Sequence, residues 1–217
     1  MSAPTWDDFA ELALKRITSS GAEYGDIRIV HSTAQTIRGE DRRIASIRDT
    51  DDVGFGVRVL YHGGWGFAAS SILSLEEVPR VTDLAVEIAR GSASVAIDKV
   101  RLAAEPVHRD RITTAVRIDP FTVPLGQKAD LLLATMESLQ AQSGVVRSSA
   151  ELWARRDRKL FVSTESTRLE FDLLASSGDC TATALYDGRF ASRSFNTPQL
   201  RRGYELIEEA DFPGRAP

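Results

Sequence analysis

Val53-Gly54-Phe55-Gly56-Val57-Arg58-Val59-Leu60-Tyr61 is followed by His62-Gly63-Gly64 and then by Trp65-Gly66-Phe67-Ala68-Ala69-Ser70. In the first run, every second residue is apolar, which is the period of a strand with one buried face. Those apolar residues are Val53, Phe55, Val57 and Val59. Gly63-Gly64 is predicted to supply the positive φ values of a hairpin turn. The stretch therefore predicts a two-stranded hairpin.

Gly54 and Gly56 lie with Arg58 on the other face of the first predicted strand. Glycines there remove side chains where another backbone, a peptide or a packed helix approaches closely. A phosphate cradle is the alternative, but no G-x-G-x-x-G opens a helix and no Gly-Lys-Ser/Thr is present. The pattern favours structural glycines in a hairpin.

Two helices frame this hairpin in the sequence. Thr5 and Asp8 form a capping box before an apolar stripe of Phe9, Leu12, Ala13 and Ile17. A second capping box, residues 74–77, predicts a helix that ends at Gly91 and buries Val78, Val81, Leu84, Ala85 and Ile88. Strands are predicted at about 26–37, 42–48, 53–61 and 65–70.

The second half of the chain repeats this plan. A helix begins at Pro124, ends before Gly144 and buries Leu131, Leu132, Met136 and Leu139. Strands follow at about 145–155, 159–163, 167–176, 180–186 and 189–193, with a hairpin signal at Asp187-Gly188. The predicted fold class is α+β, with antiparallel β-meanders and helices packed on one face. An internal repeat is predicted over 1–91 and 120–197, joined by a connector over 92–119 that includes a short edge strand.

Composition predicts a cytoplasmic domain. The formal net charge is −4, so no basic footprint favours nucleic acid. The single cysteine, Cys180, fits a reducing compartment. The acidic N-terminus has no apolar signal core, and no run is long enough to span a membrane.

Several polar groups have both a functional and a structural interpretation. Asp49, Asp51 and Asp52 offer carboxylates for a hard cation, but acidic turn residues are usually solvated turn formers. Ser70-Ser71 and Ser163-Thr164 lack a nucleophile elbow and a local histidine, which favours turn and cap roles.

Aromatic and basic residues are interpreted in the same way. His62 beside Trp65 suits either ligand stacking or a polar hairpin tip, and the tip is favoured. Trp6, Trp65 and Trp153 fit core or rim positions better than a stacking platform. The run 155–159, Arg-Arg-Asp-Arg-Lys, predicts a solvated hairpin turn, with a partner contact as the alternative.

The order of several motifs resembles the TldD/PmbA family of metallopeptidases, historically described as modulators of DNA gyrase. The landmarks, besides the 53–70 stretch, are residues 21–28, Asp119-Pro120 with Pro124-Leu125 and Lys128, residues 163–166, and Arg202-Gly203-Tyr204-Glu205. The last motif resembles the TldD branch. The resemblance covers almost the whole chain and implies an N-terminal domain of such a protein.

The resemblance implies zinc in the full-length protein, bound by an H-E-x-x-x-H helix with a further ligand later in the chain. His31, His62 and His108 do not fit this motif, and Cys180 is the only thiol. No catalytic, cofactor-binding or metal residue is therefore assigned in 1–217. The ending after Phe212-Pro213-Gly214 resembles a chain cut at a linker, before the catalytic domain.

For this chain the resemblance implies one wall of a peptide-binding cleft, part of a subunit interface, and no peptidase activity alone. A peptide or unfolded polypeptide and a related TldD/PmbA subunit, as a homo- or heterodimer, are the expected partners. The alternative is a non-catalytic regulatory module that binds peptide or a larger homologue through its sheet.

Overall fold

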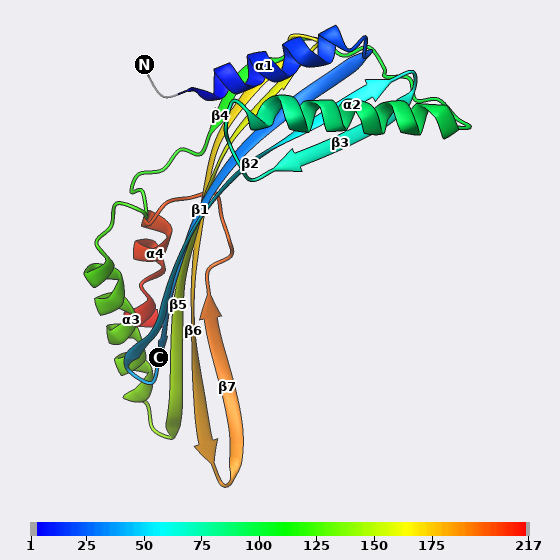
Figure 1. Ribbon diagram of the computed structural model, residues 1–217. Helices are drawn as coiled ribbons and strands as arrows, with labels where there is room; N and C mark the ends of the chain where they lie inside the picture. Colours follow the sequence, from blue (N-terminus) through cyan, green and yellow to red (C-terminus); the bar gives the residue numbers. More distant parts are fainter. Residues whose placement is uncertain (1–3, 216–217) are drawn as a thin grey trace. The chain divides into compact units, whose positions relative to one another are not determined.

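The computed structural model describes residues 4–215, which form helices and long strands (Figure 1). The order of elements is α1 (Trp6–Ser19), β1 (Tyr24–Glu40), β2 (Arg43–Tyr61), β3 (Gly64–Ser70), α2 (Glu77–Val95), β4 (Arg109–Thr113), α3 (Leu125–Gln140), β5 (Val145–Ser163), β6 (Arg168–Tyr186), β7 (Arg189–Asn196), α4 (Glu205–Ala210) and α5 (Phe212–Arg215). No helix among these residues combines the length and apolar character needed to cross a bilayer.

The strands form one sheet of seven, in the order β3-β2-β1-β5-β6-β4, with β7 also paired to β6. The α+β prediction is confirmed. So is the internal repeat, because helix, three strands and helix occur twice, as α1-β1-β2-β3-α2 and α3-β5-β6-β7-α4. The β2–β3 and β6–β7 turns are alike in backbone conformation. Their φ values are 45° and 79° at His62 and Gly63, and 48° and 72° at Asp187 and Gly188.

β2, β5 and β6 are each longer than predicted, because the predicted interruptions within them are wrong. Residues 49–52 lie inside β2, residues 155–159 lie inside β5, and residues 177–179 lie inside β6. β2, β5 and β6 continue through these polar segments, and ladder hydrogen bonds to neighbouring strands hold the backbone extended; residues 49–52 lie before Phe55, where the pairing of β2 with β3 begins. Neither the acidic run nor the basic run forms a turn.

The chain divides into two compact units. Unit 1 comprises residues up to Ser32, Asp52–Ile112 and Asp157–Asp172, and unit 2 comprises Thr33–Asp51, Thr113–Arg156 and the residues from Leu173 onward. The chain passes from one unit to the other within β1, β2, β4, β5 and β6. The units interleave in sequence, and the repeat boundaries at 1–91 and 120–197 stay a prediction.

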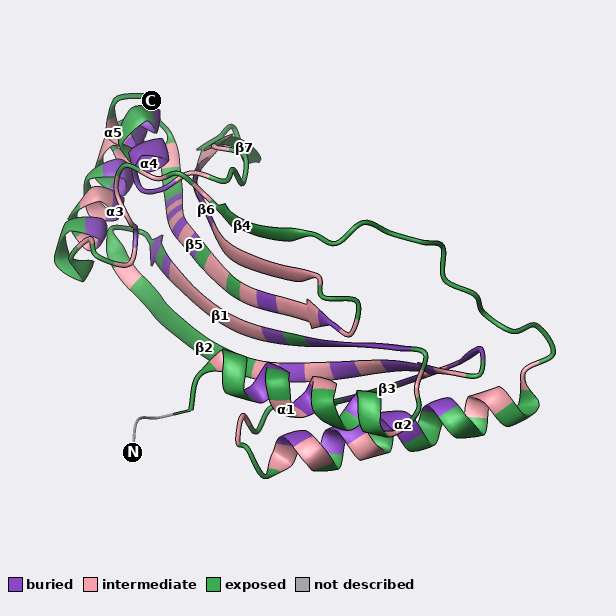
Figure 2. Ribbon diagram, turned by 90° about the horizontal axis from the view of Figure 1, so that it is seen from above, coloured by how far each residue is buried: buried purple, intermediate pink, exposed green. Residues whose placement is uncertain are grey.

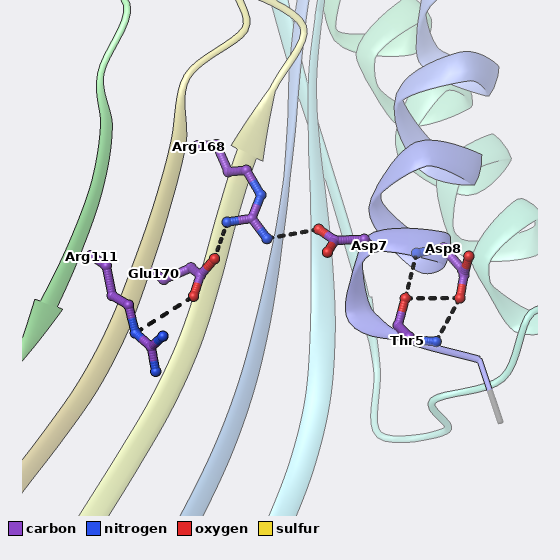
Figure 3. A network of polar contacts seen from close by, with 6 residues as sticks. All are labelled: Thr5, Asp7, Asp8, Arg111, Arg168 and Glu170. Atoms are coloured by element: carbon purple, nitrogen blue, oxygen red, sulfur yellow. Dashed lines mark hydrogen bonds and ion pairs between the residues drawn. The ribbon is translucent and has the colours of Figure 1, made fainter. Parts of the chain in front are cut away.

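In unit 1, α1 and α2 cover one face of the strands (Figure 2). The predicted capping box is present, because the Thr5 hydroxyl accepts from the Asp8 N–H and the Asp8 carboxylate accepts from the Thr5 N–H. The core beneath the helices includes Phe9, Ala13, Ile17, Ile27, Ile29, Phe55, Val57, Val59, Val78, Val81 and Ala85. Figure 3 shows how Arg168, paired to Glu170 on its own strand, also holds Asp7 of α1 at 2.8 Å.

The second helix differs from its prediction in two respects. It runs past Gly91 to Val95, because a glycine in right-handed conformation does not end a helix. Leu84 and Ile88 are about two-fifths exposed, and Thr82, Val86 and Ala89 are buried instead. The predicted connector therefore contains the end of α2 and, as expected, a short strand, β4, which ends the strand order.

In unit 2, α3 packs its predicted residues Leu132, Met136 and Leu139 into a second core with Ile37, Leu152 and Cys180. The Arg202-Gly203-Tyr204-Glu205 motif closes this core. The buried Glu205 carboxylate accepts hydrogen bonds from the backbone N–H groups of Ile118 and Gly203, each at 3.0 Å. The Tyr204 N–H donates to the Ile118 carbonyl at 2.8 Å. This motif thus holds the segment before α3 through backbone hydrogen bonds to Ile118.

Candidate functional site

The β2–β3 hairpin places an unpaired strand edge in unit 1. The turn consists of His62 and Gly63, and Gly64 already opens β3, so the prediction of a turn at Gly63-Gly64 is displaced by one residue. The register pairs Tyr61 with Gly64, Val59 with Gly66 and Val57 with Ala68. β3 ends the strand order, and within residues 4–215 its one paired strand is β2.

The register also tells which backbone groups of β3 point outward. In a two-residue hairpin the pair that flanks the turn is hydrogen-bonded, and hydrogen-bonded pairs then alternate along the ladder. Gly64, Gly66 and Ala68 therefore bond to β2, whereas the N–H and C=O groups of Trp65, Phe67 and Ala69 face away from it. These three residues form the outward edge of β3.

Glycines let α2 lie directly on β3. A β-carbon at Gly66 would lie 2.0 Å from the Ala85 carbonyl oxygen, and one at Gly64 would lie 2.2 Å from the Ala93 nitrogen. The predicted close approach of a helix is found, but at Gly64 and Gly66. At Gly56 the space is taken by the Phe67 ring instead, 2.8 Å from a β-carbon there.

The face of the unit 1 strands that α1 and α2 do not cover is called the open face below. A buried carboxylate lies at its centre, since Asp26 is 1% exposed. Its Oδ2 accepts from Arg58 Nε at 2.9 Å and lies 2.7 Å from Nη2. The Arg58 guanidinium lies 4.7 Å from the centre of the Trp65 ring, and Tyr24 meets Trp65 edge-on at 5.9 Å. Burial, with the Asp26 charge beside it, raises the pKa of Tyr24 to about 12.

The contacts of Arg58 with Asp26 and Trp65 fix these side chains next to the outward edge of β3. Phe67 remains 59% exposed beside it. The Arg58 guanidinium and the exposed Phe67 ring therefore lie next to the unpaired N–H and C=O groups on the outward edge of β3. Such an edge is suited to adding an extended peptide through main-chain hydrogen bonds, with side-chain contacts on the open face.

The residues with a possible role in catalysis or metal binding do not come together. Asp49, Asp51 and Asp52 lie along β2, and Asp49 accepts a hydrogen bond from Gln35. Within residues 4–215 no three His, Cys, Asp or Glu side chains are close enough to hold a metal ion. The donor set described here therefore does not fit a zinc centre. Cys180 is buried, and burial raises the pKa of its thiol.

The histidines and hydroxyl groups have structural surroundings. His31 lies in β1, and His108 precedes β4. His62 occupies the hairpin tip, 3.6 Å from Glu23, with its ring against Tyr61. The Ser70 hydroxyl accepts from the Ile72 N–H, and the Thr164 hydroxyl accepts from the Gly25 N–H.

The tryptophans differ in their placement. Trp6 packs against the unit 1 core, and Trp153 lies within β5. Trp65 was predicted as a core or rim residue, and the structure adds its contact with Arg58. Sequence reasoning gave Asp26 and Arg58 no site role. Their charge and their places on one face of neighbouring strands were the available signal.

Several solved structures have a fold similar to that of this chain. A candidate modulator of a DNA gyrase from Thermotoga maritima matches with a TM-score of 0.75 at 16% identity, over 96% of this chain and 46% of that one. A second candidate modulator, from Bacteroides thetaiotaomicron, gives 0.73 at 13% identity over 95% and 50%. TldE from Thermococcus kodakarensis gives 0.62 at 11% identity over 93% and 46%.

Residues 25–89 match the family model described as PmbA/TldA metallopeptidase domain 1. The resemblance to the TldD/PmbA family is therefore confirmed, and the match to the family model lies within residues 25–89. The TldD branch stays a prediction.

Two curated relatives are named metalloprotease. The protein from Methanocaldococcus jannaschii is 27% identical over 153 residues, which are 70% of this chain and 33% of the relative. The one from Methanothermobacter thermautotrophicus is 24% identical over 190 residues, 88% of this chain and 40% of the relative. The chain thus spans between a third and two-fifths of the length of these relatives.

Proposed function

We propose that this chain is the N-terminal domain of a TldD-like zinc metallopeptidase and that it forms one wall of a peptide-binding cleft. The family match over residues 25–89 and the relatives named metalloprotease support this proposal. The described residues offer no fitting zinc ligands, so the role proposed for them is to bind and align the polypeptide. This chain alone is expected not to hydrolyse peptides.

The outward edge of β3 carries the proposal. An extended polypeptide that pairs with Trp65, Phe67 and Ala69 would gain main-chain hydrogen bonds that do not depend on its sequence. Side chains on the same face would then contact Phe67 and the neighbouring cluster. A strand added to a sheet edge is held extended, which is the backbone form that presents successive peptide bonds in a regular row.

Proline at Ala69 is expected to abolish peptide binding while the fold is kept. Proline has no N–H, and at this position the lost donor is one that faces away from β2. Binding of a fluorescein-labelled unfolded polypeptide, such as reduced and alkylated lactalbumin, would be measured by anisotropy. We expect at least a tenfold loss of affinity for Ala69→Pro, since several edge hydrogen bonds are disturbed together.

Ala69→Thr is the matched control, because threonine favours strands and retains the donor. It should bind like the parent chain. Equal affinity of the proline and threonine variants, with both folded by circular dichroism, would show that peptides do not add to this edge.

A related TldD/PmbA subunit is the second proposed partner, and its surface is proposed to lie on unit 2. The tip of the β6–β7 hairpin supports this, because Tyr186 is 85% exposed and Phe190 70%. Large exposed aromatic side chains are enriched at protein interfaces. The non-catalytic regulatory module remains the alternative function and would use the same edge and the same tip.

A further inference from the structure

The open face of unit 1 contains an apolar hollow away from the β3 edge. Its volume is about 300 Å³, and its apolar lining is Val30, Leu160, Phe161, Leu169 and Phe171 from β1, β5 and β6. That is the lower end of the size range of ligand pockets and suits a single large side chain. The other two lining residues are cationic, Arg28 and Lys159.

Arg28 is held in place but exposed. Its guanidinium lies 5.3 Å from the centre of the Phe161 ring, and its Nε lies 3.3 Å from Asp26 Oδ1. The side chain is 55% exposed. The Phe161 ring and the Asp26 carboxylate thus fix the guanidinium beside the hollow, where its terminal nitrogens are accessible to a ligand.

The single negative charge of Asp26 is shared between Arg28 and Arg58, so it neutralises Arg28 only in part. Arg58 approaches Oδ2 of the same carboxylate at 2.7 Å, whereas Oδ1 has no hydrogen-bond partner in the described structure. Two guanidinium groups share one carboxylate that is itself buried. Lys159, in contrast, has its own partner, Asp157, at 3.4 Å. A ligand that reaches the hollow therefore meets the positive charge of Arg28 next to apolar rings.

We propose that this hollow selects peptide segments in which an acidic side chain stands two residues from a large apolar one. The apolar side chain enters between Phe161 and Phe171, and the carboxylate binds Arg28. In an extended peptide, residues i and i+2 point to the same side and lie about 7 Å apart. With that spacing, the apolar side chain can occupy the hollow while the carboxylate binds Arg28 beside it.

This inference rests on the proposed function, because it names which polypeptides the peptide-binding wall prefers. Since Arg28 is half exposed, the expected preference is moderate and falls with ionic strength.

The test compares three labelled peptides on the 217-residue chain: Gly-Ser-Glu-Thr-Phe-Thr-Gly-Ser and its versions with Gln for Glu or Ala for Phe. We expect the parent peptide to bind about fivefold more tightly than the Gln peptide at low salt, and the difference to shrink at high salt. The Ala peptide should be weaker than the parent peptide. Arg28→Gln should remove the preference for Glu over Gln, whereas Arg101→Gln, the same change on an exposed segment of unit 1, should preserve it.

The outcomes separate the two proposals. If the Glu and Gln peptides bind equally to the unaltered chain, the selection of acidic segments is wrong while peptide binding stands. If none of the peptides binds, both proposals are overturned. A preference for Glu that persists in a folded Arg28→Gln chain would also contradict the role of Arg28.

Discussion

Replacing Gly66 with alanine is expected to prevent unit 1 from folding stably. The new β-carbon would lie 2.0 Å from the Ala85 carbonyl oxygen and 2.4 Å from the Ala89 nitrogen. Both atoms belong to the backbone of α2, so no side chain can turn aside, and the helix must move off β3. The core of Val78, Val81, Ala85 and Ala89 would lose its packing. The expected cost is about 3 kcal/mol or more.

Gly91→Ala is the matched control in α2. Nothing lies within 4 Å of a β-carbon there, and the glycine has helical backbone. Alanine at this site should stabilise the chain by about 0.5–1 kcal/mol. Urea unfolding followed by circular dichroism distinguishes the two variants. Equal midpoints for Gly66→Ala and the parent chain would contradict the close packing of α2 on β3.

Replacing Glu205 with alanine is expected to have the second largest effect, in unit 2. The change removes the buried carboxylate that accepts hydrogen bonds from the N–H groups of Ile118 and Gly203. Each unsatisfied buried donor costs about 1–3 kcal/mol, so a loss of about 3 kcal/mol is expected. Glu209→Ala is the control, since Glu209 is half exposed and pairs with Arg202, and it should change stability by about 0.5 kcal/mol or less.

The same carboxyl makes unit 2 sensitive to acid. Burial would raise the pKa of Glu205, but the backbone N–H groups that bind its carboxylate outweigh burial and lower the pKa below 4.5. A lowered pKa stabilises the fold above the pKa of the unfolded chain, and this stabilisation is lost as the pH falls through the folded value. Urea midpoints measured from pH 7 to pH 3 should therefore converge for the parent chain and Glu205→Ala. A constant gap between them would contradict this account.

The sequence was sufficient for the fold class, the internal repeat and most core faces. Alternation at Phe55, Val57 and Val59 identified the buried face of β2 correctly, and the capping box at Thr5 located the start of α1. These features depend on local spacing, which a sequence displays directly. The helix end at Gly91 was wrong because glycine ends a helix only where the backbone turns left-handed.

The strand lengths could not be predicted. Charged residues over 49–52 and 155–159 have low strand propensity, and pairing with neighbouring strands of the sheet keeps them extended. The candidate site was missed for a similar reason. Asp26, Arg58 and Trp65 are separated in sequence, and their contact depends on the pairing of β1, β2 and β3. One motif of the family resemblance, Gly203-Tyr204-Glu205, has a structural role, because the Glu205 carboxylate binds the backbone N–H groups of Ile118 and Gly203.

The most direct test of peptide addition at β3 is amide hydrogen exchange, residue by residue, with and without a saturating unfolded polypeptide. The account predicts that the N–H groups of Trp65, Phe67 and Ala69 exchange at least tenfold more slowly in the complex. Those of Gly66 and Ala68, which already bond to β2, should change little. If peptide binds and the three outward amides keep their free exchange rates, the polypeptide lies elsewhere and the proposed edge is wrong.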